Sequence, residues 1–336
     1  MTSIWAVVAV LGASSAFEVV VSAWLLQASL RIAPANKTKF QTAMATTLAV
    51  WLLSLVVFAQ AAGLMSVAPR NRAIQFLIGA GALGLIGGLS LWMLISRHRT
   101  SQQQAAFAWL AIQFATWPNL LLAQFVVKPY LVEAFTVPVN SMAPTICGEH
   151  LQEPCPVCGG TLIVSSSSVK LDRDLGICTD CLRTTEVPIL DRKLYGGDRV
   201  LVCKVLKPRR WDLIVFRYPD DPSVPYVKRL VGLPGETLSI HDGGVWVQDK
   251  ELQKPANLSG LTYVANPFRP QENIWGPVTL AADESFVLGD FSARSKDSRL
   301  WEVGAPGHPP YAVPDTHLIG VVTHIYWPPS RWRVFR

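Results

Sequence analysis

The first 100 residues of this 336-residue chain contain almost no acidic side chains. Glu18 is the single carboxylate there, against seven lysines and arginines, whereas residues 101–336 hold 23 basic and 23 acidic side chains. The excess positive charge therefore lies between long apolar runs, where it indicates membrane topology. It does not form the continuous basic surface that binds nucleic acid, so nucleic acid is not an expected partner.

Four apolar runs are each long enough to cross a bilayer as a helix, which takes about 20 residues. They cover residues 4–26, 43–67, 73–95 and 105–127. A signal peptide is the alternative for the first run, but it has no basic n-region and is too long, so we predict a membrane span. Its Glu18 is expected to face the helix bundle.

Basic residues in the loops predict how these spans are oriented. The loops after the first and third runs carry five lysines and arginines, and the loop between them carries two. Since basic loops stay in the cytoplasm, the amino terminus and everything after residue 127 are expected outside. We therefore predict a multi-span α-helical anchor over residues 1–127 and an extracytoplasmic domain over 128–336. A transporter is disfavoured because the spans hold one ionisable residue.

Residues 128–336 have a pattern typical of short strands. Runs of β-branched and aromatic residues are separated by Gly, Pro and Asp clusters; the runs are DRVLVCKV, WDLIVFRY, YVKRLVGL, GGVWVQD, SFVLGD and HLIGVVTHIYW. This pattern predicts a mostly antiparallel β domain with a curled or barrel-like sheet.

A cysteine-rich insert at residues 150–186 interrupts this domain. Two C-x-x-C pairs, separated by nineteen residues, supply Cys155, Cys158, Cys178 and Cys181. Two such pairs fit knuckles that direct four thiolates at one tetrahedral zinc, so we predict a structural zinc ribbon. Two crosswise disulfides are the alternative, because an oxidising exterior permits them.

Ser141 lies in the stretch FTVPVNSMAPTI, soon after the last apolar run. Pro138 and Pro144 flank it, and because proline fixes φ and lacks a backbone donor, the pair indicates a stiff, non-helical presentation of one hydroxyl.

A lysine 87 residues later could accept the proton of that hydroxyl. If YVKRLVGL is a strand, Lys228 lies on the opposite face from Arg229. On a core-facing side its pKa would fall toward the range of a neutral base, which a guanidinium cannot reach. On a solvated face, the alternative, it would remain an ordinary charged lysine. No histidine lies inside the segments around Ser141 or Lys228, which disfavours a Ser-His-Asp triad.

Four blocks in order resemble the bacterial type I signal peptidases, membrane-bound serine endopeptidases with a Ser–Lys dyad. The blocks are SMAPTI, GGDRVLVCKV, YVKRLVGLPGE and GDFSARSKDSR, followed by VPDTHLIGVVTHIYWP. The resemblance implies a signal-peptidase-like β fold in which Ser141 is the nucleophile and Lys228 the general base, with an acyl-enzyme intermediate. By the same resemblance, Ser295 aligns with the family serine that orients the lysine. Asp297, Ser298 and Arg299 match the family's DSR sequence and would support the site.

The resemblance also implies substrate, partners and location. The substrates would be signal peptides of exported preproteins, with membrane lipid and the secretion translocon as partners, and catalysis would need no cofactor. The protein would be a multi-pass protein of the bacterial cytoplasmic (inner) membrane, with its catalytic domain on the extracytoplasmic side.

Three positions depart from the family pattern. Val139 replaces the usual Ser or Thr that helps to bind the oxyanion, Asn140 replaces a glycine, and Phe291 replaces the asparagine of GDN. Losing one oxyanion donor lowers the rate on the order of a hundredfold unless another group substitutes, and the Asn140 amide is the expected substitute. A membrane-anchored scaffold that has lost catalysis and binds through the zinc ribbon therefore remains the alternative function.

Overall fold

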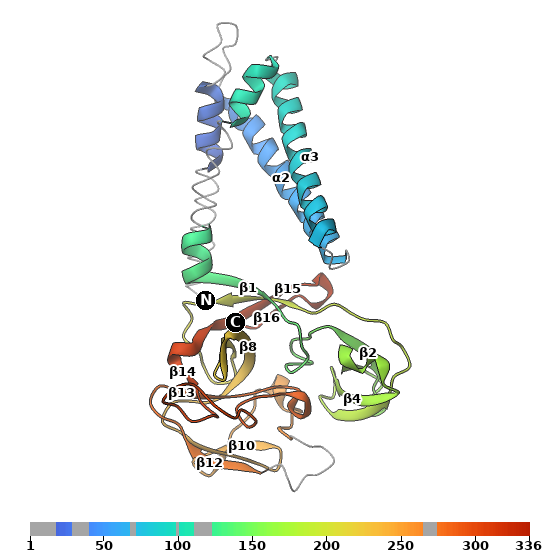
Figure 1. Cartoon of the computed structure of the whole chain (residues 1–336), viewed down its shortest axis with the longest axis vertical. Helices are drawn as coiled ribbons and strands as arrows, with labels where there is room; N and C mark the ends of the chain where they lie inside the picture. The colour runs from blue at the N-terminus through green and yellow to red at the C-terminus, as the bar shows by residue number, and fades with distance from the viewer. Residues whose placement is uncertain (1–17, 29–39, 68–71, 99–100, 111–122, 265–273) are drawn as a thin grey trace. The chain divides into compact units, whose positions relative to one another are not determined.

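The computed structural model describes residues 18–28, 40–67, 72–98, 101–110, 123–264 and 274–336 (Figure 1). The chain divides into two compact units, Thr2–Lys128 and Pro129–Arg336.

The first unit is helical in its described parts, Ser101 excepted. Its two long helices are α2 (Phe40–Val67) and α3 (Arg72–His98), accompanied by the shorter helix Glu18–Ala28 and by helical residues 102–110. Leu26, Ala43, Leu94 and Ala105 are fully buried against one another, so these helices share one small apolar core.

The membrane anchor is tested only in part by these helices. Among the described residues, the segment Ala80–His98 is the one helix that passes a test of length and apolar composition for crossing a bilayer. Of the predicted runs, 4–26 and 105–127 fall partly outside the described residues, at 4–17 and 111–122. The four-span anchor therefore stays a prediction.

The second unit is built around an eight-stranded antiparallel sheet. Its strands run in the order β1-β6-β15-β7-β8-β13-β14, with β16 paired to β15. The bounds are β1 Val132–Thr136, β6 Arg199–Cys203, β7 Leu213–Tyr218, β8 Asp221–Gly232, β13 Glu284–Leu288, β14 Val313–Pro314, β15 Leu318–Trp327 and β16 Arg333–Val334.

A second antiparallel sheet has the order β11-β10-β9-β12. Its strands are β9 Thr237–His241, β10 Gly244–Val247, β11 Lys250–Glu251 and β12 Trp275–Thr279. The helical segment η1 (Ala123–Leu131) precedes β1. Short helical turns join later strands: η2 Ser166–Lys170, η3 Ala256–Leu258, η5 Ser292–Arg294, η6 Asp315–His317 and η7 Pro329–Arg331.

The six runs read as strands from the sequence coincide with β6, β7, β8, β10, β13 and β15. Their β-branched and aromatic side chains fill three apolar clusters, which is the packing such residues favour on a pleated surface. The prediction of a mostly antiparallel β domain is confirmed.

The cysteine-rich insert forms a third, four-stranded antiparallel sheet in the order β2-β3-β4-β5. Its strands are β2 His150–Pro154, β3 Thr161–Ser165, β4 Arg173–Cys178 and β5 Thr184–Pro188. In sequence the insert lies between the turn that carries Ser141 and strand β6, so both of its ends connect to the large-sheet part of the domain.

Candidate active site

Ser141 lies in a compact turn that follows β1. The amide of Ala143 donates to the carbonyl of Asn140, and that of Ile146 to Met142, both at 2.9 Å. Met142 and Ile146 are fully buried in the core cluster under the large sheet. Because these two apolar side chains anchor the turn, the hydroxyl of Ser141, whose residue is 8% exposed, is held in a fixed position.

Lys228 reaches this hydroxyl from strand β8, where it pairs with Ile214 of β7. Its Nζ donates to Oγ of Ser141 at 2.6 Å, and the residue is 3% exposed. The structure thus places Lys228 on the buried side, the first of the two alternatives drawn from the sequence.

Burial lowers the pKa of Lys228 from 10.5 to about 8, because a buried ammonium loses its hydration. The carboxylates of Asp297 and Asp290 oppose this shift and raise the pKa, while Arg299 lowers it. Both carboxylates are themselves paired with arginines, which weakens their pull on the lysine. A sizeable fraction of Lys228 is therefore neutral near pH 8 and able to take a proton.

One buried ion pair lies directly beside the lysine on β8. Arg229 donates to both oxygens of Asp290, at 2.7 and 2.5 Å, and to the carbonyl of Trp211. Thr145, in the turn that carries Ser141, donates its hydroxyl to Asp290 at 2.5 Å. Asp290 therefore ties the serine turn to the lysine strand.

A second buried pair closes the loop after β13. Arg299 donates to both oxygens of Asp297 at 2.8 Å, and Asp297 accepts the amide N–H of Gly289 at 3.0 Å. The hydroxyl of Ser298 accepts the amide of Val287 at 3.0 Å. These three predicted support residues thus hold the loop to the end of β13, and among the described residues their side chains make no hydrogen bond to Ser141.

Ser295 does not make the contact that the sequence predicts. Its buried Oγ has no hydrogen-bond partner among the described residues, Lys228 included. The hydroxyl packs against Gly289 instead, so closely that a Cβ at position 289 would overlap it and would also crowd the carbonyl of Ser141. Ser295 is therefore a packing neighbour of the Ser141 backbone in this structure.

The expectation for Asn140 also needs correction. Its Nδ2 donates to the carbonyl of Glu149 at 2.7 Å and its Oδ1 accepts the amide of Gly148 at 2.9 Å. Because both ends of the amide are committed to this turn, the side chain is not directed at an oxyanion. Val139 is 59% exposed and supplies no donor.

A third ion pair, between a buried aspartate and a partly exposed arginine, was not predicted from the sequence. Asp198, fully buried, accepts the amide of Cys147 at 2.8 Å and is bridged by Arg331 at 2.8 and 3.0 Å. Arg331 also donates to the carbonyl of Pro144. The only signal was an aspartate in GGDRV next to an apolar strand; its partner lies 133 residues away.

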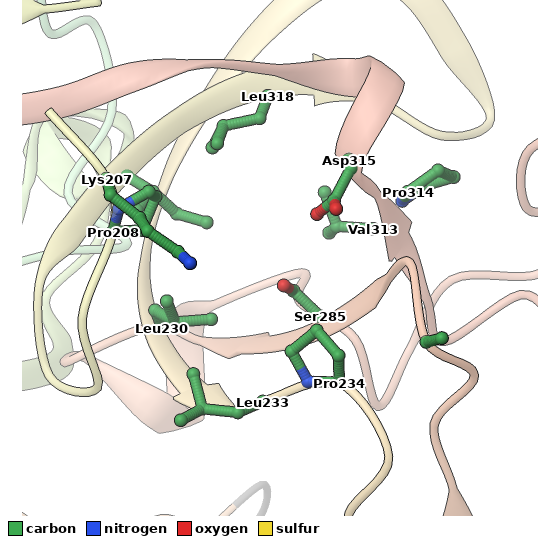
Figure 2. A pocket seen from close by; sticks show the side chains of 12 residues that line it. Lys207, Pro208, Leu230, Leu233, Pro234, Ser285, Val313, Pro314, Asp315 and Leu318 are labelled. Atoms are coloured by element: carbon green, nitrogen blue, oxygen red, sulfur yellow. The ribbon is translucent and has the colours of Figure 1, made fainter. Parts of the chain in front are cut away.

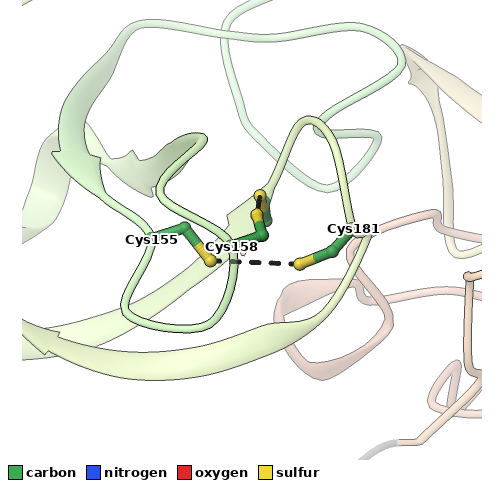
Figure 3. Close-up of side chains that lie close together, drawn as sticks. Cys155, Cys158 and Cys181 are labelled. Atoms are coloured by element: carbon green, nitrogen blue, oxygen red, sulfur yellow. Dashed lines mark hydrogen bonds between the residues drawn. The ribbon is translucent and has the colours of Figure 1, made fainter.

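The four cysteines of the insert converge at one end of its sheet; Figure 3 labels Cys155, Cys158 and Cys181. Their sulfurs all lie within 4.8 Å of one another, with Cys155 and Cys181 at 3.9 Å and Cys158 and Cys178 at 3.5 Å. A disulfide would need about 2.05 Å. Four sulfurs bonded to one zinc at about 2.3 Å would be about 3.8 Å apart, so the cluster fits a tetrahedral metal.

A hollow of about 640 Å³ lies elsewhere on the domain (Figure 2). Lys207 faces Ser285 and Asp315 across it, and apolar side chains such as Leu230 and Leu318 complete its wall. Neither Ser141 nor Lys228 lines this hollow, so it is separate from the contact between these two residues.

Comparison with known proteins places the chain in a family. Residues 184–327 match the model of the family described as signal peptidase, peptidase S26. Signal peptidase I of Mycobacterium tuberculosis is 30% identical over 241 residues, 68% of this chain and 74% of that protein. Signal peptidase I of Pseudomonas aeruginosa is 26% identical over 235 residues, 62% of this chain and 70% of the relative.

A solved structure of a signal peptidase I from Enterococcus faecalis is 28% identical and covers 35% of this chain and 99% of that chain, with a TM-score of 0.27. The assignment accordingly rests on the sequence matches, which extend over more than two thirds of a relative at 30% identity. The chain belongs to the signal peptidase I family and is a serine endopeptidase that processes signal peptides.

Proposed function

We propose that Ser141 is the nucleophile and Lys228 the general base of this signal peptidase. The observation that carries the proposal is the 2.6 Å contact between Lys228 Nζ and Ser141 Oγ, with both residues buried. A neutral amine at this distance can accept the hydroxyl proton, which is the activation that a serine needs at ordinary pH. A scaffold without catalysis is not favoured, because it would not need this contact.

The reaction follows from this pair. As Lys228 takes the proton, Ser141 Oγ attacks the scissile carbonyl of the signal peptide. The lysine ammonium then protonates the leaving amine, and the signal peptide remains as an ester on Ser141. A water molecule, deprotonated by the again neutral lysine, hydrolyses the ester and restores the serine.

The oxyanion has one evident donor in the described residues. The amide N–H of Ser141 makes no hydrogen bond to any of them and is thus free to donate to the developing charge. A second donor, at position 139, is absent because that residue is valine. A donor lost from an oxyanion site lowers the rate on the order of a hundredfold, so this enzyme should be slow for its fold.

We also propose that Cys155, Cys158, Cys178 and Cys181 bind one structural zinc. The support is the convergence of four free thiols within 4.8 Å in two knuckles. Metal analysis of the full chain should give about one zinc per chain. If the protein contains neither zinc nor reactive thiols, the four cysteines form disulfides and the zinc proposal is wrong.

Location and partners are inferred from the loop charges and the apolar segments. The anchor of residues 1–127 would span the bacterial cytoplasmic membrane several times and keep the domain 128–336 outside, beside membrane lipid and the translocon. Protease added to spheroplasts should digest the domain 128–336. If the domain is digested only after the membrane is opened, it lies in the cytoplasm and the proposed orientation is wrong.

Preprotein cleavage in detergent tests the dyad. Ser141→Ala and Lys228→Arg should each abolish cleavage, because the first removes the nucleophile and the second leaves a permanently charged group at the base position. Ser167→Ala and Lys250→Arg change an exposed serine and an exposed lysine and should leave the rate unchanged. Wild-type cleavage no faster than that of Ser141→Ala would refute the assignment.

A further inference from the structure

The insert packs directly against the turn that carries Ser141 and against the loop after β13. Ile163 of β3 and Ile177 of β4 share one buried cluster with Ala143 and Cys147 of the serine turn and with Phe291 of the loop after β13. All five are essentially inaccessible to solvent. Apolar surface of the insert therefore forms the wall against which the serine turn rests.

Phe291 connects this wall to the nucleophile. Its ring is fully buried in the shared cluster, while its backbone N–H donates to the carbonyl of Ser141 at 3.1 Å. A shift of the wall would displace the ring, and the displaced backbone would carry the Ser141 carbonyl with it. One residue thus transmits the position of the insert to the nucleophile.

Asn140 makes a second connection from the other side of Ser141. Its side chain holds the amide of Gly148 and the carbonyl of Glu149, immediately before β2 begins at His150. Gly148 lies so close to Val139 that a Cβ there would be 2.6 Å from its backbone. The start of the insert is therefore fastened to the residue that precedes the nucleophile.

An ion pair supplies the third connection. Arg294, at the end of the turn that follows Phe291, pairs with the buried carboxylate of Asp174 on β4. Asp174 is oriented by the hydroxyl of Ser168 and by the amide of Leu175. Strand β4 ends at Cys178, one of the four cysteines, so this contact lies four residues from the thiol cluster.

The insert is too small to hold its own shape by apolar burial alone. Its private core consists of a few aliphatic residues beside two of the cysteines. Sheets of this size usually need a metal or disulfides, and in such units the metal-binding free energy is folding free energy. The geometry of β3 and β4, and so of the wall, should therefore depend on whether the four thiolates are joined.

We infer that the insert positions the nucleophile, so that metal bound at its four cysteines sets the rate of cleavage without contacting substrate. Phe291 and Asn140 are the positioning residues. Both are sites where the sequence departs from the family pattern, and each departure creates a contact with the insert or its start. The inference rests on the proposed roles of Ser141 and of the cysteines.

The full-length protein in detergent tests this. Zinc content, kcat and KM for a preprotein are measured before and after chelation and again after zinc is restored. Removing zinc should lower kcat by at least about tenfold, as expected for a misplaced reacting group, and change KM by less than about threefold. Restored zinc should recover kcat.

Two variants separate positioning from loss of folding. Phe291→Asn restores the family residue but puts an amide against the apolar wall, so it should keep about one zinc per chain and still lose kcat by about tenfold. Phe291→Leu keeps the position apolar and should retain most of kcat. Equal kcat values for Phe291→Asn and wild type would overturn the role of this residue.

Two further outcomes would overturn either this inference or the proposed dyad. A zinc-free protein that cleaves with wild-type kcat, or a wild type that never binds metal, overturns the inference while leaving the dyad intact. If Ser141→Ala cleaves as fast as wild type, the proposed dyad fails instead, and that result is read in zinc-loaded protein independently of chelation.

Discussion

Replacing Lys228 by methionine should stabilise the catalytic domain while abolishing cleavage. The residue is 3% exposed, and burial lowers its pKa from 10.5 to about 8. One pKa unit corresponds to about 1.36 kcal/mol, so the charged form is destabilised in the folded state by about 3 kcal/mol. Methionine has a similar length and carries no charge, so this penalty disappears.

The advantage of the variant should depend on pH in a defined direction. Between about pH 8 and pH 10.5 the unfolded lysine binds a proton that the folded lysine has released, so wild-type stability rises with pH across this window. The difference between Lys228→Met and wild type should therefore be full below pH 8 and should vanish near pH 10.5.

Thermal unfolding followed by tryptophan fluorescence measures the stability difference between Lys228→Met and wild type. For a unit of this size, a stabilisation of about 3 kcal/mol corresponds to a rise in Tm of roughly 6 to 12 °C. Lys207→Met changes an exposed lysine and should stay within about 0.5 kcal/mol of wild type. A Lys228→Met protein that is no more stable than wild type at pH 7 would refute the account of a desolvated lysine.

Three further predictions concern the oxyanion donor and the buried contacts that stabilise the site. Val139→Ser should raise kcat, with an upper limit on the order of a hundredfold, because it adds a second donor; an unchanged kcat would mean that the donor is not missing. Asp290→Asn leaves Arg229 as an unpaired buried charge and should lower the free energy of unfolding by about 3 to 5 kcal/mol in denaturant titrations. Ser298→Ala removes the partner of the buried Val287 amide and should lower it by about 1 to 3 kcal/mol, so a Tm equal to that of wild type would contradict the role of this bond.

Alternating patterns and short blocks were sufficient to predict the strands and to single out Ser141 and Lys228. Register is fixed where one face of a strand is buried and the other exposed. The run LIVFRY is buried at every position except Arg217, so it marks a strand but does not fix the register. Whether Lys228 faced the core or solvent stayed open in the sequence, because the face covered by neighbouring strands depends on the whole sheet.

Side-chain direction was the main source of error. Asn140 was expected to face the oxyanion and Ser295 the lysine, yet the first bonds to Gly148 and Glu149 and the second packs on Gly289. Neither partner can be inferred from spacing, since each is brought close only by tertiary packing.

Contacts of the insert were likewise not predictable from sequence spacing. Its four cysteines were recognisable from spacing, but its contact with Phe291 was not, because an apolar residue in a polar loop signals only that something covers it. The pairing of Asp198 with Arg331 was not predictable either, because the two residues are 133 positions apart in sequence and are brought together only by the fold.

Acylation of Ser141 itself is the most direct test of the mechanism. The full chain is treated with a reactive acylating peptide across a range of pH, and the labelled residue and its rate are determined by mass spectrometry. The account predicts a label on Ser141, a rate that rises with pH through about 8 as Lys228 loses its proton, and no label in Lys228→Arg. A label on another residue, or the same rate in Lys228→Arg, would contradict it.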